Sequence, residues 1–351
     1  MKSTKEVKKT LFDFLKLKEL TRIAIISDND EDGLTAAVQA KLFFDKKKIE
    51  SKVLFYDHTK QNGSFSRKEF VDFNPEKTIF IDLSENFVFD ILEHVGDFTG
   101  DFVIIDHHRG IEVVNSHNKF LTIKPTEFSD KDPSKYPASK MIYDLLEGKD
   151  WLAAIGIIGD FSSGEWKKFV EKAAENNNIK VEQLEELAKI IACVVSVHCK
   201  KTYSLFEFLL KSKKPGDLFK SNFFPLAKSF FETLEKETKR FEKDVEKIDL
   251  DLYFFETQKN LQSKLSNMIS QNHPHNTIFV YAIEEDFVKG SMRRQDFKFD
   301  CNLATRFALD GIENATGGGH IPATGCRFPI DYFDTFKAKL LKYAKKNYRK
   351  Q

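Results

Sequence analysis

Acidic side chains gather in one short segment near the start of the chain, residues 28–33 (DNDEDG). Three of them, Asp28, Asp30 and Asp32, stand on alternate positions directly after an apolar run. In an extended turn alternate side chains point the same way, and carboxylates so close together repel one another unless a cation lies among them. Asp and Asn are also common turn and helix-capping residues. The segment alone is therefore consistent with either a metal site or a cap, although a calcium loop is excluded because no glutamate stands at the required distance.

Further metal-ligating residue types follow later apolar runs. Asp82 follows residues 78–81, Asp106-His107-His108 follows residues 102–105, and Asp160 follows an apolar run that ends in Gly159. Asp82 alone could equally cap a helix, but two adjacent histidines after an apolar run are unusual for a core. Carboxylates combined with imidazole favour manganese, iron or zinc over calcium, and Mn²⁺ fits a carboxylate-rich site best.

The elements that must position these residues are short strands and helices in alternation. Residues 23–26, 78–81 and 102–105 are continuous apolar runs, which is typical of strands buried on both faces of a parallel sheet. Residues 35–44 and 86–95 have helical spacing. Strands that alternate with helices predict a doubly wound α/β domain, in which ligands bind outside the carboxyl ends of the strands. The aspartates are expected at that edge.

The rest of the chain changes character twice. Residues 166–245 are predicted to form a helical connector, because residues 181–195 and 223–243 have clear helical patterns. Strand signals then return, which predicts a smaller mixed α/β domain over residues 246–351 that ends in a basic helix at 337–350. That helix is either a solvated helix end or a surface that follows a phosphate backbone. The first predicted domain covers residues 1–165.

Composition limits the classes of function. The chain has 351 residues, 41% of them hydrophobic and 31% charged, and no apolar run approaches the length of a membrane span, so no membrane partner is expected. The net charge of +1 does not by itself indicate a nucleic-acid binder. Residues 1–20 lack the features of a secretion signal and predict a surface helix in a cytoplasmic protein. Four scattered cysteines form neither a disulfide framework nor a paired zinc pattern.

The order of these motifs is informative. An aspartate pair with glycine, a lone aspartate after a strand, Asp-His-His and Gly-Asp, in that order, resemble motifs I to IV of the DHH phosphoesterases. In the second half, Ser291-Met292-Arg293 and Gly317-Gly318-Gly319-His320 are similar to the substrate-binding signatures of the DHHA1 domain. The resemblance covers residues 21–329. Each motif is weak alone, but six in the right order are improbable by chance.

The resemblance implies a metal centre. In this family the motif aspartates and the first histidine of Asp-His-His hold one or two divalent metals. Carried over, one site would consist of Asp30, Asp82, His107 and Asp160, and Asp28 would form a second site with a bridging Asp82. Two-metal chemistry would stabilise both the attacking and the leaving oxygen.

Two further residues of the same motifs would act beside the metals. His108 would face the scissile phosphate as a hydrogen-bond donor or proton shuttle, and Asp106 would orient a histidine. Many small-substrate members of the family carry a histidine where this chain has Ala24. This departure favours the RecJ-like nucleases, and Asp32 could replace the missing ligand or cap the following helix.

Substrate binding is expected in the second domain. The backbone N–H groups of Gly317, Gly318 and Gly319 would approach a phosphate, and His320 would add a donor. Ser291 belongs to the same signature as Arg293. The guanidinium of Arg293 is suited to donate two hydrogen bonds to a phosphate, and Arg294 could add a further contact.

The leading functional hypothesis is a RecJ-like, Mn²⁺-dependent exonuclease that releases 5′-mononucleotides from single-stranded DNA or RNA, with Mg²⁺ or Co²⁺ as substitutes. The alternative is a nano-RNase or phosphatase for very short oligonucleotides, 3′-phosphoadenosine 5′-phosphate or cyclic dinucleotides. A third hypothesis is a catalytically inactive scaffold in a replication complex. A replication or repair protein is a further expected partner of an active enzyme.

Overall fold

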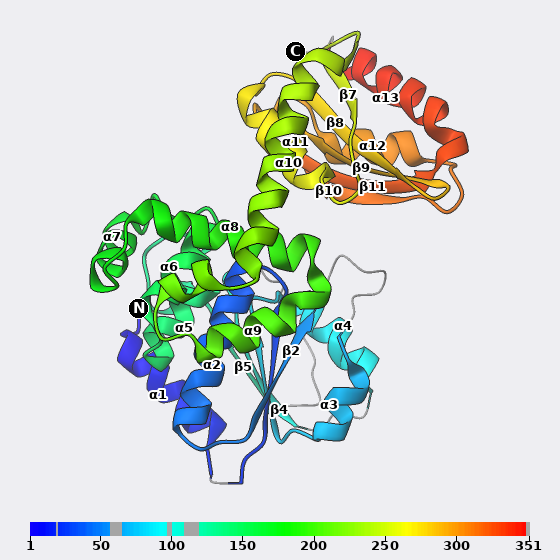
Figure 1. The fold of residues 1–351 in the computed structure, drawn as a ribbon. Coiled ribbons are helices and arrows are strands. Elements are labelled where there is room, and N and C mark those ends of the chain that lie inside the picture. Colours follow the sequence, from blue (N-terminus) through cyan, green and yellow to red (C-terminus); the bar gives the residue numbers. More distant parts are fainter. Residues whose placement is uncertain (19, 57–64, 97–99, 109–118, 349–351) are drawn as a thin grey trace. The chain divides into compact units, whose positions relative to one another are not determined.

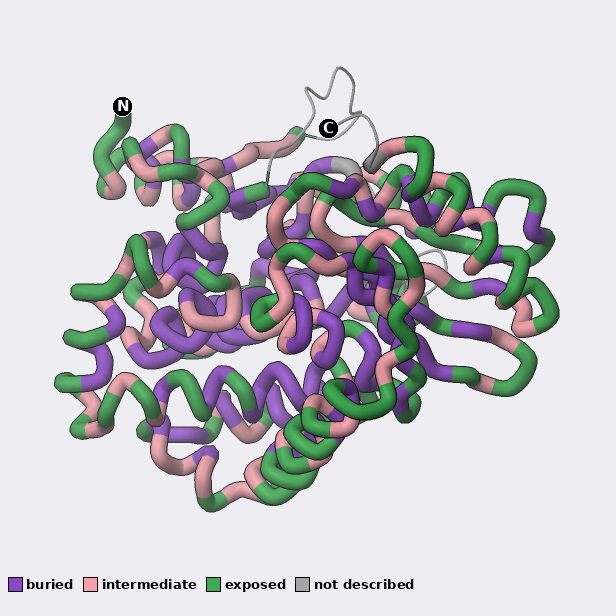
Figure 2. The backbone as a smooth tube through the Cα atoms, turned by 90° about the horizontal axis from the view of Figure 1, so that it is seen from above, coloured by how far each residue is buried: buried purple, intermediate pink, exposed green. Residues whose placement is uncertain are grey.

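The computed structural model describes residues 1–18, 20–56, 65–96, 100–108 and 119–348 (Figure 1). The chain divides into two units, residues 1–228 and 229–351. Buried stretches alternate with exposed turns along the backbone (Figure 2). Arg349 and Lys350, which belong to the expected basic helix, lie outside the described residues.

The first unit is built on a parallel sheet with the strand order β2-β1-β3-β4-β5. The strands are short. β1, β3 and β4 are almost wholly buried because helices cover both faces of the sheet, whereas the edge strands β2 and β5 are only partly buried. Their bounds are β1 (Ile23–Asp28), β2 (Ser51–Tyr56), β3 (Lys77–Ile81), β4 (Asp101–Ile105) and β5 (Phe120–Ile123).

Alternate residues of these strands face opposite layers of helices. Ile26, Phe80 and Ile104 pack with Phe70 and Val88 of helices α3 and α4 in one core. The other face is covered by α2, which in turn packs on α5 and α6 (Figure 1). The helices of this unit are α1 (Thr4–Leu15), α2 (Glu31–Lys46), α3 (Arg67–Phe73), α4 (Glu85–Val95), α5 (Ala138–Leu146), α6 (Asp150–Gly159), α7 (Lys167–Asn176), α8 (Val181–Val197) and α9 (Thr202–Lys211).

Helix α10 (Phe223–Asp244) contains the boundary between the two units. Short 3₁₀ helices complete the chain. They are η1 (Pro125–Glu127), η2 (Pro133–Lys135), η3 (Cys199–Lys201), η4 (Pro215–Lys220) and, in the second unit, η5 (Ile330–Tyr332).

The second unit contains a mixed sheet with the strand order β10-β11-β9-β8-β7-β6, in which only β7 and β8 are parallel. One face forms a core in which Phe254, Phe279 and Phe328 meet Ala304 of α12 and Phe336 of α13. The opposite face packs on α11. The elements are β6 (Glu246–Ile248), β7 (Leu252–Glu256), α11 (Gln262–Asn272), β8 (Thr277–Glu284), β9 (Phe287–Arg293), α12 (Cys301–Leu309), β10 (Thr316–His320), β11 (Ala323–Pro329) and α13 (Phe333–Tyr348).

The predicted fold class is confirmed: a parallel-sheet α/β unit, a helical segment and a smaller mixed α/β unit follow one another along the chain. The predicted domain borders at 165 and 245 remain a prediction. The expected N-terminal surface helix corresponds to α1, which buries Val7, Leu11 and Leu15. Within the described residues, no helix combines the length and the apolar character needed to span a bilayer.

Candidate metal centre

Four neighbouring strands end in ionisable residues that lie in one row across the sheet. β1 ends at Asp28, and the residues that follow β3, β4 and β5 are Asp82, Asp106 and Lys124. The amide of Asp82 donates to the carbonyl of Ile105 at 3.0 Å, which continues the ladder by one step. Because the strands are parallel and in register, their carboxyl ends bring these side chains to one edge of the sheet.

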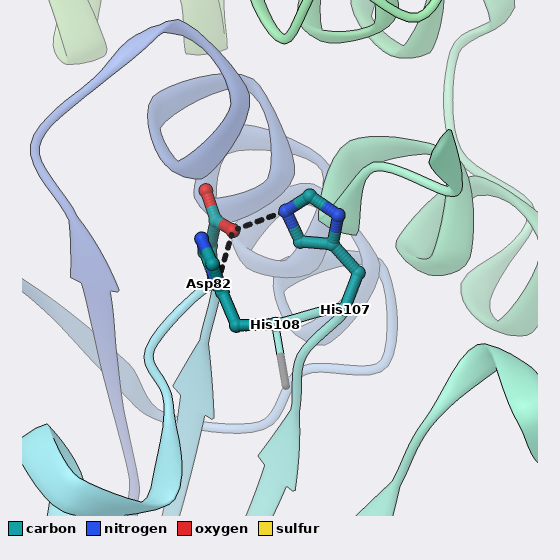
Figure 3. A group of neighbouring side chains, drawn as sticks. All are labelled: Asp82, His107 and His108. Carbon is teal, nitrogen blue, oxygen red and sulfur yellow. Dashed lines mark ion pairs between the residues drawn. The ribbon is translucent and has the colours of Figure 1, made fainter. Parts of the chain in front are cut away.

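Asp82 has the features of a residue held in place for function. Its φ of 60° lies in the left-handed region, which is uncommon for a residue with a side chain. Its Oδ1 is buried and receives no hydrogen bond within the described part of the chain. The same oxygen lies 3.3 Å from Nε2 of His107 and 3.8 Å from Nδ1 of His108 (Figure 3). A buried carboxylate oxygen without a donor, close to ring nitrogens, is suited to a shared cation.

Two groups of potential ligands share Asp82. Asp82 forms one group with His107 and His108 and another with Asp28 and Asp30, and in each group the ligand atoms lie within 4.8 Å of one another. Carboxylate oxygens and imidazole nitrogens are ligands that Mn²⁺ and related divalent ions accept. The side chains therefore fit one or two divalent cations, with Asp82 between them.

The pKa values reflect the crowding of like charges. Burial, followed by the carboxylates of Asp32, Asp30 and Asp28, raises the pKa of Asp82 well above its ordinary range. Burial and Asp28 do the same to the pKa of Asp30. Burial and the nearby Asp32 raise the pKa of Asp160 to about 7. A cation among these groups would relieve the repulsion that raises their pKa values.

A second chain of charges orients His108. Asp106 is fully buried, with Oδ1 at 2.7 Å from Nδ1 of His108 and Oδ2 at 2.5 Å from the ammonium of Lys124. That ammonium also pairs with Glu85 at 3.0 Å. Burial acts to raise the pKa of Asp106, but His108 and Lys124 outweigh it and lower the pKa to about 2. Asp106 is therefore ionised, His108 donates from Nδ1, and the pKa of His108 is raised by this hydrogen bond first. Nε2 of His108 is left for another partner.

Asp32 caps a helix and is not a member of either group of potential ligands. Its two carboxylate oxygens accept the amides of Ala138 and Ser139, at 2.6 and 3.0 Å, and so cap the start of α5. The cap of α2 is instead Asp30, which accepts the amide of Gly33 at 2.8 Å. A Cβ at Gly33 would lie 2.4 Å from the Asp28 carbonyl oxygen, so this glycine permits close packing of the helix on the strand.

Asp160 lies at the end of α6 and belongs to neither ligand group among the described residues. It accepts the hydroxyl of Ser162 at 3.0 Å. α6 can approach α2 closely at this point because a Cβ on Gly159 would lie 2.5 Å from Glu31 Cβ. The next residue, Phe161, is 73% exposed and has a φ of 52°. An exposed aromatic residue in a strained backbone conformation is unexplained by packing.

The predicted substrate-binding residues of the second unit lie on three adjacent strands. Gly317, Gly318 and Gly319 are part of the edge strand β10, and His320 ends it. β11 separates β10 from β9, and the register places His320, Ala323 and Arg293 in one row. The structure thus brings the glycine signature and the arginine signature to the same part of one sheet.

The polar side chains around this row differ in whether they already have a hydrogen-bond or ion-pair partner. Nε of Arg293 is buried without a hydrogen-bond partner among the described residues, and burial lowers the pKa of its guanidinium. Ser291 shares a hydrogen bond of 2.9 Å with Ser266 of α11. Arg294 is buried and pairs with Asp296 at 2.7 Å, so it stabilises the fold rather than helping Arg293. Arg293 is therefore suited to an external anion.

Sequence reasoning missed Lys124, Glu85 and the role of Asp32. Lys124 follows the short and partly exposed strand β5, which has no clear apolar pattern. Its position directly after a strand was the one feature of the sequence that could have indicated that Lys124 lies at the site. The partners of Asp32 lie more than 100 residues away in the sequence, so no local pattern could indicate them.

Comparison with known proteins supports the architecture. No family model and no curated protein sequence matches the chain. Solved structures do match. An exonuclease RecJ bound to manganese has a TM-score of 0.74 at 15% identity, covering 98% of this chain and 95% of that one. RecJ from Thermus thermophilus in complex with Mn²⁺ has a TM-score of 0.69 at 15% identity and covers 99% of this chain.

This chain spans about 55% of the length of Thermus thermophilus RecJ. CDC45 from Entamoeba histolytica has a TM-score of 0.57 at 11% identity, covering 97% of this chain and 98% of that one. At such low identities the likeness concerns the fold. The chain has the fold of the RecJ-like DHH proteins.

Proposed function

We propose that the chain is a metal-dependent phosphodiesterase that hydrolyses single-stranded DNA or RNA from one end. The observation that carries the proposal is Asp82, whose strained backbone and donor-free buried oxygen lie between two groups of potential ligands. When bound, divalent ions supply positive charge that stabilises a reacting phosphate and makes water a usable nucleophile near neutral pH. Mn²⁺ is the proposed ion, because the ligands mix carboxylate with imidazole and the RecJ structures are named as manganese complexes.

Different side chains are proposed to bind the ions and to contact the reacting phosphate. Asp28, Asp30, Asp82 and His107 hold the ions, and Asp160 is proposed as a further ligand. His108 donates a proton or hydrogen bond from Nε2 to the reacting phosphate. Its ring is fixed for this role by Asp106 and Lys124.

Anion recognition is proposed for the second unit. Arg293 would fork onto a phosphate, since its Nε lacks a partner among the described residues. His320 lies in the same row of the sheet, and the glycine edge strand lets a phosphate approach the backbone. Asn302 accepts the Gly319 amide at 3.1 Å, so phosphate contact there is proposed through the other backbone groups.

Phe161 favours a substrate with unpaired bases. Its ring is exposed next to Asp160, and its left-handed backbone is a conformation that bulky residues rarely adopt. Unstacked bases of a single strand stack on such rings regardless of sequence, whereas bases in a duplex are not available to them.

A second candidate is hydrolysis of very short substrates, such as oligonucleotides of a few residues, 3′-phosphoadenosine 5′-phosphate or cyclic dinucleotides. One observation favours it. Two lysines of α13 are already neutralised, because Lys337 pairs with Glu246 at 2.7 Å and Lys345 with Asp249 at 3.6 Å. Lysines that already pair with carboxylates contribute less to binding the phosphate backbone of a long single strand. A replication or repair protein remains a proposed partner in either case.

The deciding experiment is a time course with Mn²⁺ on single strands of three and thirty nucleotides, in DNA and RNA, each labelled at either end. The Asp82→Asn variant, purified identically, controls for contaminating nucleases. Steady loss of the longer strand to mononucleotides would support the exonuclease and give its polarity. Cleavage confined to the short strand would support the second candidate. Absence of cleavage of both, and of the small phosphorylated nucleotides, would contradict a phosphodiesterase and favour the scaffold.

A further inference from the structure

A cavity of about 810 Å³ lies in the first unit, away from the aspartates. It is lined by α1, by the last turns of α2 with the residues that follow, and by the turn between α5 and α6. α2 begins at Glu31 beside the metal centre and ends at Lys46 in the cavity wall. A helix of 16 residues is about 24 Å long, so the two sites are at opposite ends of it.

Positive charge is concentrated in this cavity. Six of its fifteen lining residues are lysines, against a single acid, whereas the chain as a whole has a net charge of only +1. The lysines are Lys8, Lys18, Lys46, Lys47, Lys48 and Lys149.

Among the described residues, five of these six lysines form no ion pair. Lys8 pairs with Glu147 at 2.5 Å, and Lys149 donates to the carbonyl of Ser212 at 2.8 Å. Within the described residues no ion pair involves the remaining four lysines. Like charges held together repel one another, and an anion that enters the cavity relieves that repulsion.

The cavity also has aromatic walls. The rings of Phe12 and Phe43 have centroids 5.6 Å apart, and the ammonium of Lys47 lies 5.8 Å above the Phe43 ring. Leu42 and Ile49 line the same space. Sites for small ligands are commonly cavities of this volume, with apolar walls and a few convergent polar groups. Ammonium groups match phosphates, and aromatic side chains such as Phe12 and Phe43 in the cavity wall can pack against a planar ring.

A structural explanation covers only part of the cluster. Lysines at the end of a helix stabilise the partial negative charge of its last carbonyls, which accounts for Lys46 and Lys47. Lys8 and Lys149 have partners of their own in Glu147 and the Ser212 carbonyl, but these contacts do not explain why they and Lys18, from separate segments, converge on the same cavity. The convergence of separate segments is what a binding site requires.

We propose that this cavity is a second ligand site that binds a nucleoside polyphosphate, with its phosphates on the lysines and its base against Phe12 and Phe43. The site is separate from the proposed hydrolytic centre and does not depend on it.

The test is calorimetric titration of the full chain with ATP, tripolyphosphate and adenosine in EDTA, which keeps divalent ions out of the metal centre. Wild-type protein should bind one ATP, tripolyphosphate more weakly, and adenosine undetectably. Lys47→Glu/Lys48→Glu should weaken ATP binding by about tenfold or more, because two attractive charges become repulsive. Both lysines are exposed, so the fold should persist, which thermal unfolding checks.

Two controls make the result specific. Lys168→Glu/Lys172→Glu changes the net charge equally on exposed positions of α7 and should leave ATP binding unchanged. Arg293→Gln removes the proposed phosphate ligand of the second unit and should also leave it unchanged. Equal ATP affinity in the wild type and in Lys47→Glu/Lys48→Glu would overturn the proposal, as would absence of ATP binding. Loss of single-strand binding without loss of ATP binding would assign the lysines to nucleic acid instead.

Discussion

The metal centre and the surroundings of Arg293 carry opposite charges, negative in the first and positive in the second. They differ in what can balance that charge when no ligand is bound. In the metal centre the negative charge is spread over several carboxyl groups. The pKa values of Asp30, Asp82 and Asp160 are raised, so these groups can bind protons when no cation is present. Arg293 is a single half-buried guanidinium whose Nε is buried, and such a group remains charged in proteins. Cation binding in the first unit should therefore depend on pH, whereas the contribution of Arg293 to anion binding should not.

The largest effect is expected from Asp82→Asn. Asparagine tolerates the left-handed backbone, so the change removes charge with little added strain. Hydrolysis in Mn²⁺ should fall by about a thousandfold or more, because both groups of ligands lose a shared member. The thermal unfolding temperature without metal should rise, since repulsion among the carboxylates is relieved. Wild-type turnover in this variant would refute the metal assignment.

Arg293→Gln is expected to act on the substrate and leave the metals alone. Loss of charge-assisted hydrogen bonds to a phosphate should lower kcat/KM by about a hundredfold. Calorimetry should give an unchanged Mn²⁺ affinity. Arg293→Lys, which keeps the charge but loses the fork, should recover only part of the activity. A variant that loses metal affinity together with activity would contradict the separation of the two regions.

Metal binding should show the predicted pH dependence. Below its pKa of about 7 the Asp160 carboxyl is protonated in the metal-free protein, and the pKa values of Asp30 and Asp82 are shifted in the same direction. A cation must then displace protons, so the apparent Mn²⁺ affinity should fall by about tenfold per pH unit for each proton displaced as pH drops below 7. Titrations of one protein in buffers from pH 5.5 to 8 measure this. In a His320→Gln variant, which removes the one titratable side chain proposed beside Arg293, phosphate-analogue binding over the same range should stay constant, apart from the titration of the analogue.

The smallest effect is expected from Phe161→Asn. Asparagine accepts the left-handed backbone, so the fold should be at least as stable. Loss of one stacking platform should weaken single-strand binding by about tenfold. An abasic strand of equal length should bind both proteins equally. Equal loss for both strands would show that Phe161 acts on the backbone and not on bases.

The architecture of the first unit was predictable where burial leaves a local mark. The apolar runs at 23–26, 78–81 and 102–105 became β1, β3 and β4, and Asp28 and Asp82 lie together in one group of potential ligands. β5 was not predicted, because it is short and mostly only half-buried. The glycine-rich β10 carries no alternation of side chains that could indicate a strand.

The details of the site were less predictable because they depend on contacts between distant segments. Asp32 looks like a ligand in the sequence, yet its oxygens are taken by amides of α5. Lys124 looks like a surface lysine, yet it completes the charge chain through Asp106 to His108. Such pairings arise only when the sheet sets which strand ends become neighbours.

The shared register of Asp28, Asp82, Asp106 and Lys124 makes the site a property of the assembled sheet. A chain in which one of these strands had slipped by a single residue would turn that strand's terminal side chain to the opposite face. Metal binding would then be lost even though every ligand was still present in the sequence. Mn²⁺ affinity is therefore a reporter of correct strand alignment, and it should appear only in the last step of refolding.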